Sequence, residues 1–336
     1  MPAMGRGGKG KKEKKEEPAE EAPKDFTKLF GPDGKTPLWF VLRSAALKGN
    51  LDAIKACVNM GEEKWDAVKN EKLDGRGRTV LHMAADKGHA ELVQVLLNNG
   101  CEVDKMRQPE GITPMFTACH KGHFAVVKVL NTHWQKYCDK NDLPKDVRNA
   151  LFLDPKKDTG ATPLWIACQE GHLKIVEYLL EMGARPDVRR TIGSETPLWI
   201  ASQNGHGAIV KVLLDAGADP NMVRKWDGSS PVYKAAEHGE LRSMRELIAH
   251  GADVNLCRSD SGAGPLHVAV FKGFKEAVKM LLEAGANPAA EMEAPAQEGR
   301  TPLEIATFRG HDEVKELLIA AGAQMQTEIP VGPKAV

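Results

Sequence analysis

The sequence predicts an all-α solenoid in which short helix-turn-helix units stack side by side and hairpin fingers project from the stack. The first observation is a repeated phrase, because residues 162–172 read TPLWIACQEGH and residues 196–206, 34 positions later, read TPLWIASQNGH. Blurred copies begin at Thr79, Thr113, Ser230, Gly264 and Thr301. The second observation is an apolar stripe and a Gly-Ala pair after most copies, as at Gly183 and Gly217. A period in this range is typical of solenoids.

Within one unit, the residue types favour two short helices. Thr162 is expected to cap the first helix with its hydroxyl, and Pro163 follows at the first helical position, where a missing N–H costs nothing. Gly171 ends this helix, and Gly183 ends the second one. The second helix has an apolar face made by Leu173, Ile175, Val176, Leu179 and Leu180. Neither helix can bury its apolar face alone, so the units must stack.

A polar stretch then links each unit to the next. Residues 187–195 are expected to project as a hairpin finger before the next Thr-Pro pair. The helical part keeps a constant length of 21 residues from first threonine to closing glycine in the regular copies, whereas the fingers vary. The 18 residues from Gly61 to Thr79 leave room for a detour that carries Trp65.

The repeated phrase resembles the ankyrin repeat, whose marks are Thr-Pro-Leu-His, a Gly-His step and Gly-Ala-Asp. The resemblance covers residues 31–325 and implies eight repeats: an irregular first, six internal and a capping last. In the first repeat the closing Gly49 falls four residues late, which predicts a first helix lengthened by about one turn. Residues 1–30 are interpreted as a disordered Lys/Glu-rich tail, and residues 326–336 as a C-terminal tail.

The largest departure from the repeat is an insertion at about residues 135–158. Thr113 and Thr162 are 49 residues apart, and Trp134 stands where the closing glycine is expected. Apolar spacing continues to Cys138, so the second helix is expected to run on, and a short extra helix is expected after Pro144. A tolerated surface loop and a partner-contacting element remain equal alternatives for this insertion.

Composition limits the classes of function and the compartment. The 46 basic and 46 acidic residues give zero net charge, so no global field favours nucleic acid or a membrane surface. No apolar run is long enough to span a bilayer, and the hydrophilic N-terminus predicts no signal peptide. Six cysteines without a Cys-x-x-Cys pair suit a reducing compartment. We therefore expect the cytoplasm, with the nucleus as the alternative.

The signals for catalysis, cofactors or metals are weak. Of the eleven histidines, five stand in the Gly-His step of separate repeats, far apart in the chain, so structural hydrogen bonds are expected rather than metal ligation. Residues 5–11 match part of a phosphate-binding loop, yet Lys12 stands where that loop needs serine or threonine. We expect no enzyme activity, no cofactor and no metal.

Ankyrin arrays generally bind partners with the exposed side of their first helices, which lines a concave groove, and with their finger tips. The candidate groove residues that this resemblance implies are Lys87, Lys121, Phe271, Lys272, Phe308 and Arg309. Phe271 and Phe308 are large aromatics at nominally exposed positions in adjacent repeats, which predicts a binding hot spot. Contact with a neighbouring finger is the alternative.

Basic residues also fall on successive fingers. They are Arg76, Arg78, Lys105, Arg107, Lys156, Lys157, Arg189, Arg190, Arg224, Lys225 and Arg258, with Trp226 beside Lys225. A basic row along one edge would favour an acidic or extended protein segment over RNA or anionic lipid. The partner-binding candidates among these are Arg189, Arg190, Arg224, Lys225 and Trp226. The alternative is an ordinary solvated surface.

A series of aromatic residues occupies the position where the ankyrin phrase has histidine. Its members are Phe116, Trp165, Trp199 and Tyr233, in four consecutive repeats. We expect this aromatic ladder to be structural, with stacking between repeats replacing the lost histidine ring hydrogen bonds. Lining of the groove is the alternative interpretation.

Two functions remain open. The favoured one is a soluble, non-catalytic scaffold or adaptor that binds a partner protein through its groove and basic fingers without self-association. The alternative is a fixed architectural subunit of a large cytoskeletal, axonemal or ribonucleoprotein assembly.

Overall fold

The computed structural model describes residues 29–107, 110–144, 153, 159–293 and 301–324. In this part of the chain the regular secondary structure is entirely helical, with two isolated β-bridges, so the predicted fold class is confirmed. Both expected tails, apart from residues 29 and 30, lie outside the described residues. So do Lys156, Lys157 and the extra helix expected after Pro144.

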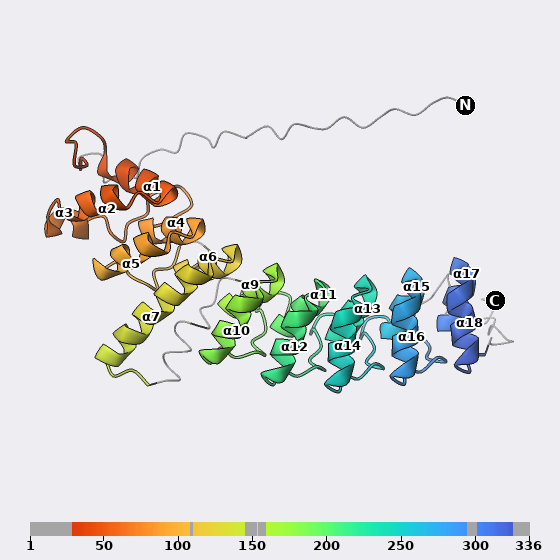
Figure 1. Cartoon of the computed structure of the whole chain (residues 1–336). Coiled ribbons are helices and arrows are strands. Elements are labelled where there is room, and N and C mark those ends of the chain that lie inside the picture. The colour runs from red at the N-terminus through yellow and green to blue at the C-terminus, as the bar shows by residue number, and fades with distance from the viewer. Residues whose placement is uncertain (1–28, 108–109, 145–152, 154–158, 294–300, 325–336) are drawn as a thin grey trace, which may run out of the picture.

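Eight helix pairs follow one another in the part of the chain that the structure describes (Figure 1). The pairs are α1 (Leu38–Lys48) and α2 (Leu51–Val58), α4 (Val80–Lys87) and α5 (Ala90–Asn98), α6 (Pro114–Lys121) and α7 (Phe124–Lys140), α9 (Pro163–Glu170) and α10 (Leu173–Glu181), α11 (Pro197–Gln203) and α12 (Gly207–Asp215), α13 (Pro231–His238) and α14 (Leu241–Ala249), α15 (Pro265–Lys272) and α16 (Lys275–Glu283), and α17 (Pro302–Arg309) and α18 (Asp312–Ala320). A short helix, α3 (Glu62–Asp66), follows the first pair.

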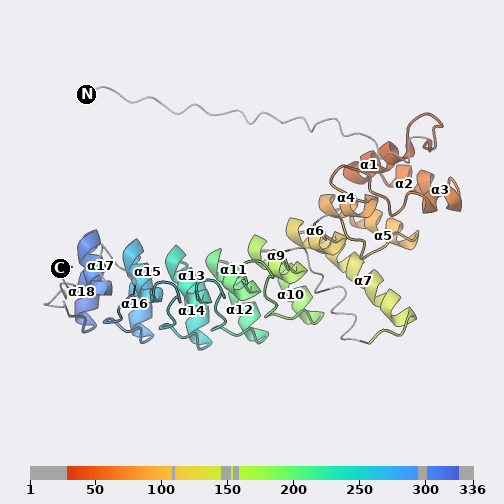
Figure 2. The same cartoon turned by 180° about the vertical axis from the view of Figure 1, so that it is seen from behind.

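The pairs build two layers. Each first helix packs on the first helix of the next pair, from α1 through α4, α6 and α9 to α17, and the second helices form a parallel series from α2 to α18. The core lies between the layers: α9 contributes Leu164, Ala167 and Cys168, and α10 contributes Ile175, Val176 and Leu179. Seen from both sides, the pairs from α9 onward form a row and the earlier pairs turn away from it, so the array bends at α6 and α9 (Figures 1 and 2).

The expected caps are present. The Thr162 hydroxyl accepts the Trp165 backbone N–H at 3.1 Å, and the Thr196 hydroxyl accepts that of Trp199 at 3.1 Å. Gly171 closes α9 in the left-handed conformation, with φ of 80°. A side chain is excluded there for a second reason, because an added Cβ would lie 2.7 Å from Cε1 of His206 in the next repeat.

That contact explains the Gly-His steps. His206 Nε2 donates to the Gln169 carbonyl at 3.1 Å, and His123 Nε2 donates to the Asp86 carbonyl at 3.0 Å. Each ring therefore packs on the closing glycine of the preceding repeat and bonds to its last turn. The expected structural role of these histidines is confirmed.

The irregular repeats also agree with their spacing. Helix α1 has 11 residues against 8 in α4, so the first helix is lengthened as expected. In the detour, Trp65 is buried and its Nε1 donates to the Asn99 carbonyl at 2.6 Å. Helix α7 extends for 17 residues to Lys140. It buries Trp134, whereas Tyr137 is half exposed and stacks on Trp134 with ring centroids 5.5 Å apart.

Candidate partner-binding surfaces

The aromatic ladder is buried, as the structural interpretation predicted, but its packing partners differ from those expected. Trp165 and Trp199 are almost fully buried. The Arg190 guanidinium lies 4.5 Å from the ring centroid of Trp165, and that of Arg224 lies 5.1 Å from the ring centroid of Trp199. The finger arginine 25 positions later thus covers each ring, and the expectation of ring stacking between repeats was wrong. A guanidinium on an indole face is a favourable cation–π contact.

The expectation that the aromatic ladder loses the hydrogen bonds of the histidine ring was also wrong at one position. Trp199 Nε1 donates to the Ser229 carbonyl at 3.1 Å, and His82 Nε2 donates to the Ile112 carbonyl at 2.9 Å. In both cases the acceptor lies 30 positions later, so indole replaces imidazole as the donor to the following finger. Trp165 is different, because its buried Nε1 has no hydrogen-bond partner among the described residues.

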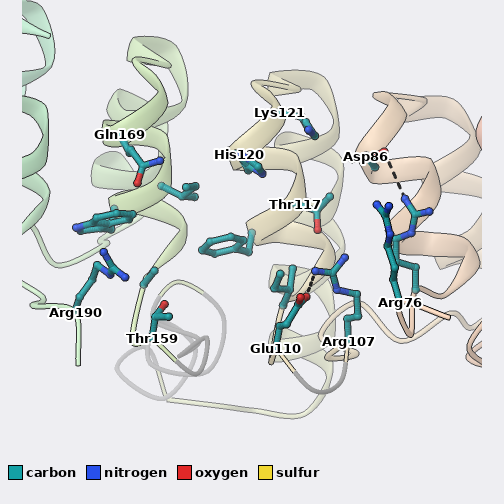
Figure 3. A pocket seen from close by; sticks show the side chains of 16 residues that line it. Arg76, Asp86, Arg107, Glu110, Thr117, His120, Lys121, Thr159, Gln169 and Arg190 are labelled. Atoms are coloured by element: carbon teal, nitrogen blue, oxygen red, sulfur yellow. Dashed lines mark hydrogen bonds and ion pairs between the residues drawn. The ribbon is translucent and has the colours of Figure 1, made fainter. Parts of the chain in front are cut away.

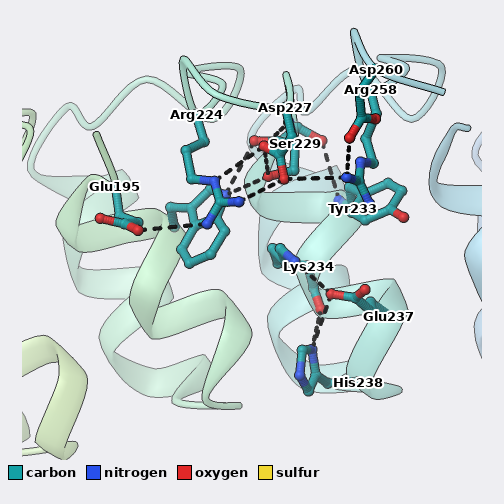
Figure 4. A network of polar contacts seen from close by, with 12 residues as sticks. Glu195, Arg224, Asp227, Ser229, Tyr233, Lys234, Glu237, His238, Arg258 and Asp260 are labelled. Atoms are coloured by element: carbon teal, nitrogen blue, oxygen red, sulfur yellow. Dashed lines mark hydrogen bonds and ion pairs between the residues drawn. The ribbon is translucent and has the colours of Figure 1, made fainter. Parts of the chain in front are cut away.

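The finger arginines are ion-paired within the array, and Figure 4 shows the resulting network. Arg224 lies 3.6 Å from the Glu195 carboxylate and 2.8 Å from that of Asp227. Arg258 lies 3.7 Å from Asp227 and also pairs with Asp260. These arginines and acids alternate along the fingers, so the arginines do not form the uncompensated basic row that was predicted.

Asp227 is the centre of this network. Its burial acts to raise the pKa, but hydrogen bonds from Arg224 and Ser229 outweigh burial and lower the pKa of Asp227 to about 2. The Arg224 Nε–H bond to Asp227 is 3.1 Å long, and the Ser229 hydroxyl donates to the same carboxylate oxygen at 2.8 Å. The ionised carboxylate therefore ties two finger arginines to the ladder.

The finger tips expose apolar as well as basic side chains. Trp226 exposes 75% of its surface, and Ile192, at the equivalent position one repeat earlier, exposes 57%. Lys225 is exposed beside Trp226. Arg189 instead reaches back, and its guanidinium donates to the Val223 carbonyl of the next finger. Ile192 was missed by sequence reasoning, although aligning the fingers at a period of 34 would have paired it with Trp226.

The two candidate aromatics of the groove lie in the last turns of α15 and α17. Phe308 exposes 61% of its surface, and Phe271 exposes 38%. The Arg309 guanidinium covers one face of Phe271, 3.8 Å from the ring centroid, and Lys272 Nζ lies 6.0 Å from the same centroid. Among the described residues the partial cover of Phe271 thus comes from its own helix and the neighbouring one, and Phe308 stays the more open ring.

A pocket of 480 Å³ lies on the same side of the first helices at the bend of the array (Figure 3). Its lining comes from α4, α6, α9 and their fingers, and includes Arg76, Arg78, Arg107, Lys121, Trp165 and Arg190. The sequence had assigned these residues to separate fingers and helices. Only the stacking of three repeats brings them around one hollow.

Comparison with known proteins gives the family. The family profile described as "Ankyrin repeats (3 copies)" matches six overlapping stretches, which together cover residues 21–329. The chain belongs to the ankyrin repeat family. The stretches are residues 21–107, 42–142, 100–190, 143–224, 198–292 and 235–329. Ankyrin repeats generally mediate protein–protein interaction, and their fold alone does not specify the partner.

Individual relatives share only part of this ankyrin array. SMC5-SMC6 complex localization factor protein 1 of Homo sapiens is 32% identical over 111 residues, which is 30% of this chain and 10% of the relative. E3 ubiquitin-protein ligase XBAT33 of Arabidopsis thaliana is 48% identical over 50 residues, 15% of this chain and 10% of the relative. NF-kappa-B inhibitor alpha of Gallus gallus is 38% identical over 60 residues, 18% of this chain and 19% of the relative. The chain therefore spans a tenth to a fifth of these relatives.

The described part of the ankyrin array contains no group of three or more histidine, cysteine, aspartate or glutamate side chains placed to hold a metal ion. None of its helices combines the length and apolarity that crossing a membrane requires. All six cysteines are free thiols, and five of them are buried. Burial raises the pKa of the Cys57 thiol to about 11, so this thiol is held in its neutral form.

The sequence-predicted partner residues thus divide into three groups. Lys87 and Lys121 lie at equivalent positions on α4 and α6, Lys121 beside the pocket, with Lys87 3.7 Å from the Asp86 carboxylate. Arg189, Arg190 and Arg224 bond within the array and hold fingers in place. The exposed remainder consists of Lys225, Trp226, Phe271, Lys272, Phe308 and Arg309. Partner binding by all of them stays a prediction.

Proposed function

We propose that this ankyrin array is a non-catalytic adaptor that holds a partner protein along its first helices. The observation that carries the proposal is the aromatic pair in the last turns of α15 and α17. Phe308 leaves 61% of its surface in water, next to Phe271 and the arginine that covers it. Exposed aromatic and arginine side chains in one place are the usual composition of a binding hot spot.

The contacts suggest how a partner would be held. Arg309 is already positioned on the Phe271 ring, so binding loses little of its side-chain entropy. An apolar partner side chain would pack on Phe308 and on the uncovered part of Phe271, and an acidic neighbour would meet Arg309 and Lys272. Fully burying a phenylalanine side chain contributes about 1.5–3 kcal/mol, which is enough to dominate a modest interface.

The test compares the double variant Phe271→Ala/Phe308→Ala with the wild-type chain. Each is cross-linked to its partners in native extract, and the partners are identified by mass spectrometry. We expect the double variant to lose a partner that the wild type captures, with affinity reduced by about 2–4 kcal/mol. Phe40→Ala is the matched control, because Phe40 is half exposed on α1 at the other end of the array. Normal capture by the double variant, together with an earlier melting transition, would assign the rings to intramolecular packing.

The same extract separates the adaptor from the second candidate, a fixed architectural subunit. An adaptor elutes mostly as a monomer, whereas a built-in subunit co-fractionates at high mass. We place the protein in the cytoplasm, with the nucleus as the alternative, because its buried free thiols suit a reducing compartment.

A further inference from the structure

The pocket at the bend is a second feature of the first-helix side, distant in sequence from the aromatic pair. Its volume of 480 Å³ lies within the range of pockets that hold a ligand or a few residues of a bound segment. In Figure 3, Gln169, Arg190 and Thr159 lie on one side of the pocket, and Arg107, Arg76 and Asp86 lie on the other.

The lining carries an excess of positive charge. Five of the lining residues are cationic, and only two, Asp86 and Glu110, are acidic. Asp86 is shared, because its carboxylate lies 3.8 Å from Arg78 and 3.7 Å from Lys87. Arg76 and Lys121 make no ion pair with any described residue and are exposed at the pocket. The other three cations are ion-paired, Arg78 with Asp74 as well as Asp86, Arg107 with Glu110, and Arg190 with Glu195, so the uncompensated charge at the pocket belongs to Arg76 and Lys121.

Three of the arginines that line the pocket are largely buried, so little water surrounds their charges. The side chains of Arg78, Arg107 and Arg190 are only 12%, 17% and 23% exposed. Burial and the neighbouring Arg78 guanidinium lower the pKa of Arg107, which indicates that the cations act on one another. Charges in a poorly hydrated site attract an opposite charge more strongly than charges in open solvent do.

The pocket lining also contains a buried hydrogen-bond donor that lacks an acceptor among the described residues. The Trp165 Nε1–H has no partner within the described residues, whereas Trp199 Nε1, one repeat later, donates to Ser229. The ladder therefore bonds to its finger at Trp199 but not at the pocket. Buried polar groups are rarely left without a partner, so this N–H indicates that an acceptor is missing.

We infer that the pocket between α4, α6 and α9 binds an acidic segment of a partner protein, through carboxylates or a phosphorylated side chain. This assignment rests on the proposed adaptor function and deepens it. Clustered arginines suit such groups, because guanidinium N–H donors match carboxylate and phosphate oxygens. A protein segment fits better than RNA, since Asp86 and Glu110 interrupt the positive lining and Ile112 and Ile166 contribute apolar surface.

The test titrates full-length protein with fluorescein-labelled peptides and follows anisotropy at two salt concentrations. One peptide alternates glutamate with glycine, a second carries one phosphoserine in a neutral sequence, and a third has glutamine for glutamate. We expect one or both anionic peptides to bind in a salt-dependent manner, and the glutamine peptide not to bind. In parallel, the indole N–H signal of Trp165, assigned with Trp165→Phe, should shift in NMR spectra while that of Trp39 stays in place.

Arg76→Gln/Lys121→Gln is the main variant, because these two side chains lack ion pairs with described residues and their loss should leave the fold intact. We expect it to weaken binding of the anionic peptide by about tenfold or more. Lys55→Gln/Lys174→Gln removes the same charge from exposed positions on α2 and α10, and should change the affinity less than about twofold. Thermal melting of both variants checks that each remains folded.

Three results would overturn the assignment. The first is failure of wild type to bind either anionic peptide, and the second is equal weakening in both charge variants. The third is a labelled single-stranded RNA that binds more tightly than either peptide. Binding that appears only after deletion of residues 1–25 would instead assign the pocket to the acidic part of the chain's own N-terminal segment. None of these results affects capture through Phe271 and Phe308, so the adaptor function is tested separately.

Discussion

At the scale of single residues, one position often performs two tasks. Gly171 ends α9 and also leaves space for the His206 ring of the next repeat. Asp227 caps a finger turn and binds two arginines at once. The sequence predicted the first task of Gly171, because a helix end is a local feature. The second task depends on which residues of the next repeat come close, and no pattern within one repeat specifies that.

We expect Gly171→Ala to destabilise the array more than Gly217→Ala. Both glycines have left-handed φ, so each substitution should cost about 1–2 kcal/mol in backbone strain. Only at Gly171 does the new Cβ also meet a ring, since nothing lies within 4 Å at Gly217. Urea denaturation measures the difference, and adding His206→Ala should remove part of it. Equal losses at the two glycines would show that the ring moves aside freely.

Asp227 should make the array acid-sensitive in a defined range. Its folded pKa is about 2, below the unfolded value of ~3.9, so its contribution to stability is present above pH ~4 and is lost as the pH falls towards 2. The contribution is of the order of 2 kcal/mol, because the side chain is only 8% exposed. Asp227→Asn should lower the free energy of unfolding at pH 7. It should also make that free energy depend less on pH between pH 4 and pH 2. An unchanged pH profile in the variant would contradict this role.

At the scale of secondary-structure elements, the predictions succeeded where spacing alone decides. The late Gly49 predicted the long α1, and the missing glycine at Trp134 predicted the long α7; both are present. The ladder was correctly predicted to be structural, but its partners were not, because Arg190 reaches Trp165 only through the three-dimensional course of the finger. The pocket was missed for the same reason, since three repeats contribute to it.

The extension of α7 should behave as core at Trp134 and as surface at Tyr137. Trp134 is buried, so Trp134→Ala should destabilise the protein by about 3–5 kcal/mol through the cavity that it leaves. Tyr137 is half exposed on the same helix, and its substitution by alanine should cost about 1 kcal/mol, mainly by loss of the stacked ring. Urea unfolding followed by circular dichroism compares the two variants. Similar small losses would mean that the turns after residue 134 add nothing to the core.

At the scale of the whole molecule, the array is a chain of nearest neighbours. Each helix pair contacts the pair before it and the pair after it, so a defect is felt first by those two. The two candidate surfaces lie in different stretches of this chain: the pocket belongs to α4, α6 and α9, and the aromatic pair to α15 and α17. One partner that used both would have to extend along the array.

Nearest-neighbour stacking predicts where stability is lost. Leu303→Ala in α17 should increase amide hydrogen exchange in α17 and α18 and leave α9 and α10 protected. Leu198→Ala in α11 removes the same buried group from an internal repeat, and should increase exchange in the pairs on both sides. Exchange measured by mass spectrometry on the intact proteins separates these patterns. A uniform rise across the array in both variants would show that it unfolds as one unit.

Each closing glycine of a first helix leaves a space, here called its seat, that a side chain of the next repeat fills. This packing has a consequence for how such a gene can change. His206 occupies the seat at Gly171, but Glu240 occupies the one at Gly205, and Phe274 the one at Gly239. Adjacent repeats are therefore matched in pairs, because each closing glycine leaves space for the particular side chain that the next repeat presents. Excising the repeat that begins at Thr196 keeps the period but sets a carboxylate in a seat shaped for imidazole. Recombination that duplicates or deletes single repeats is then penalised at the new junction, and lineages that keep the order of repeats are favoured.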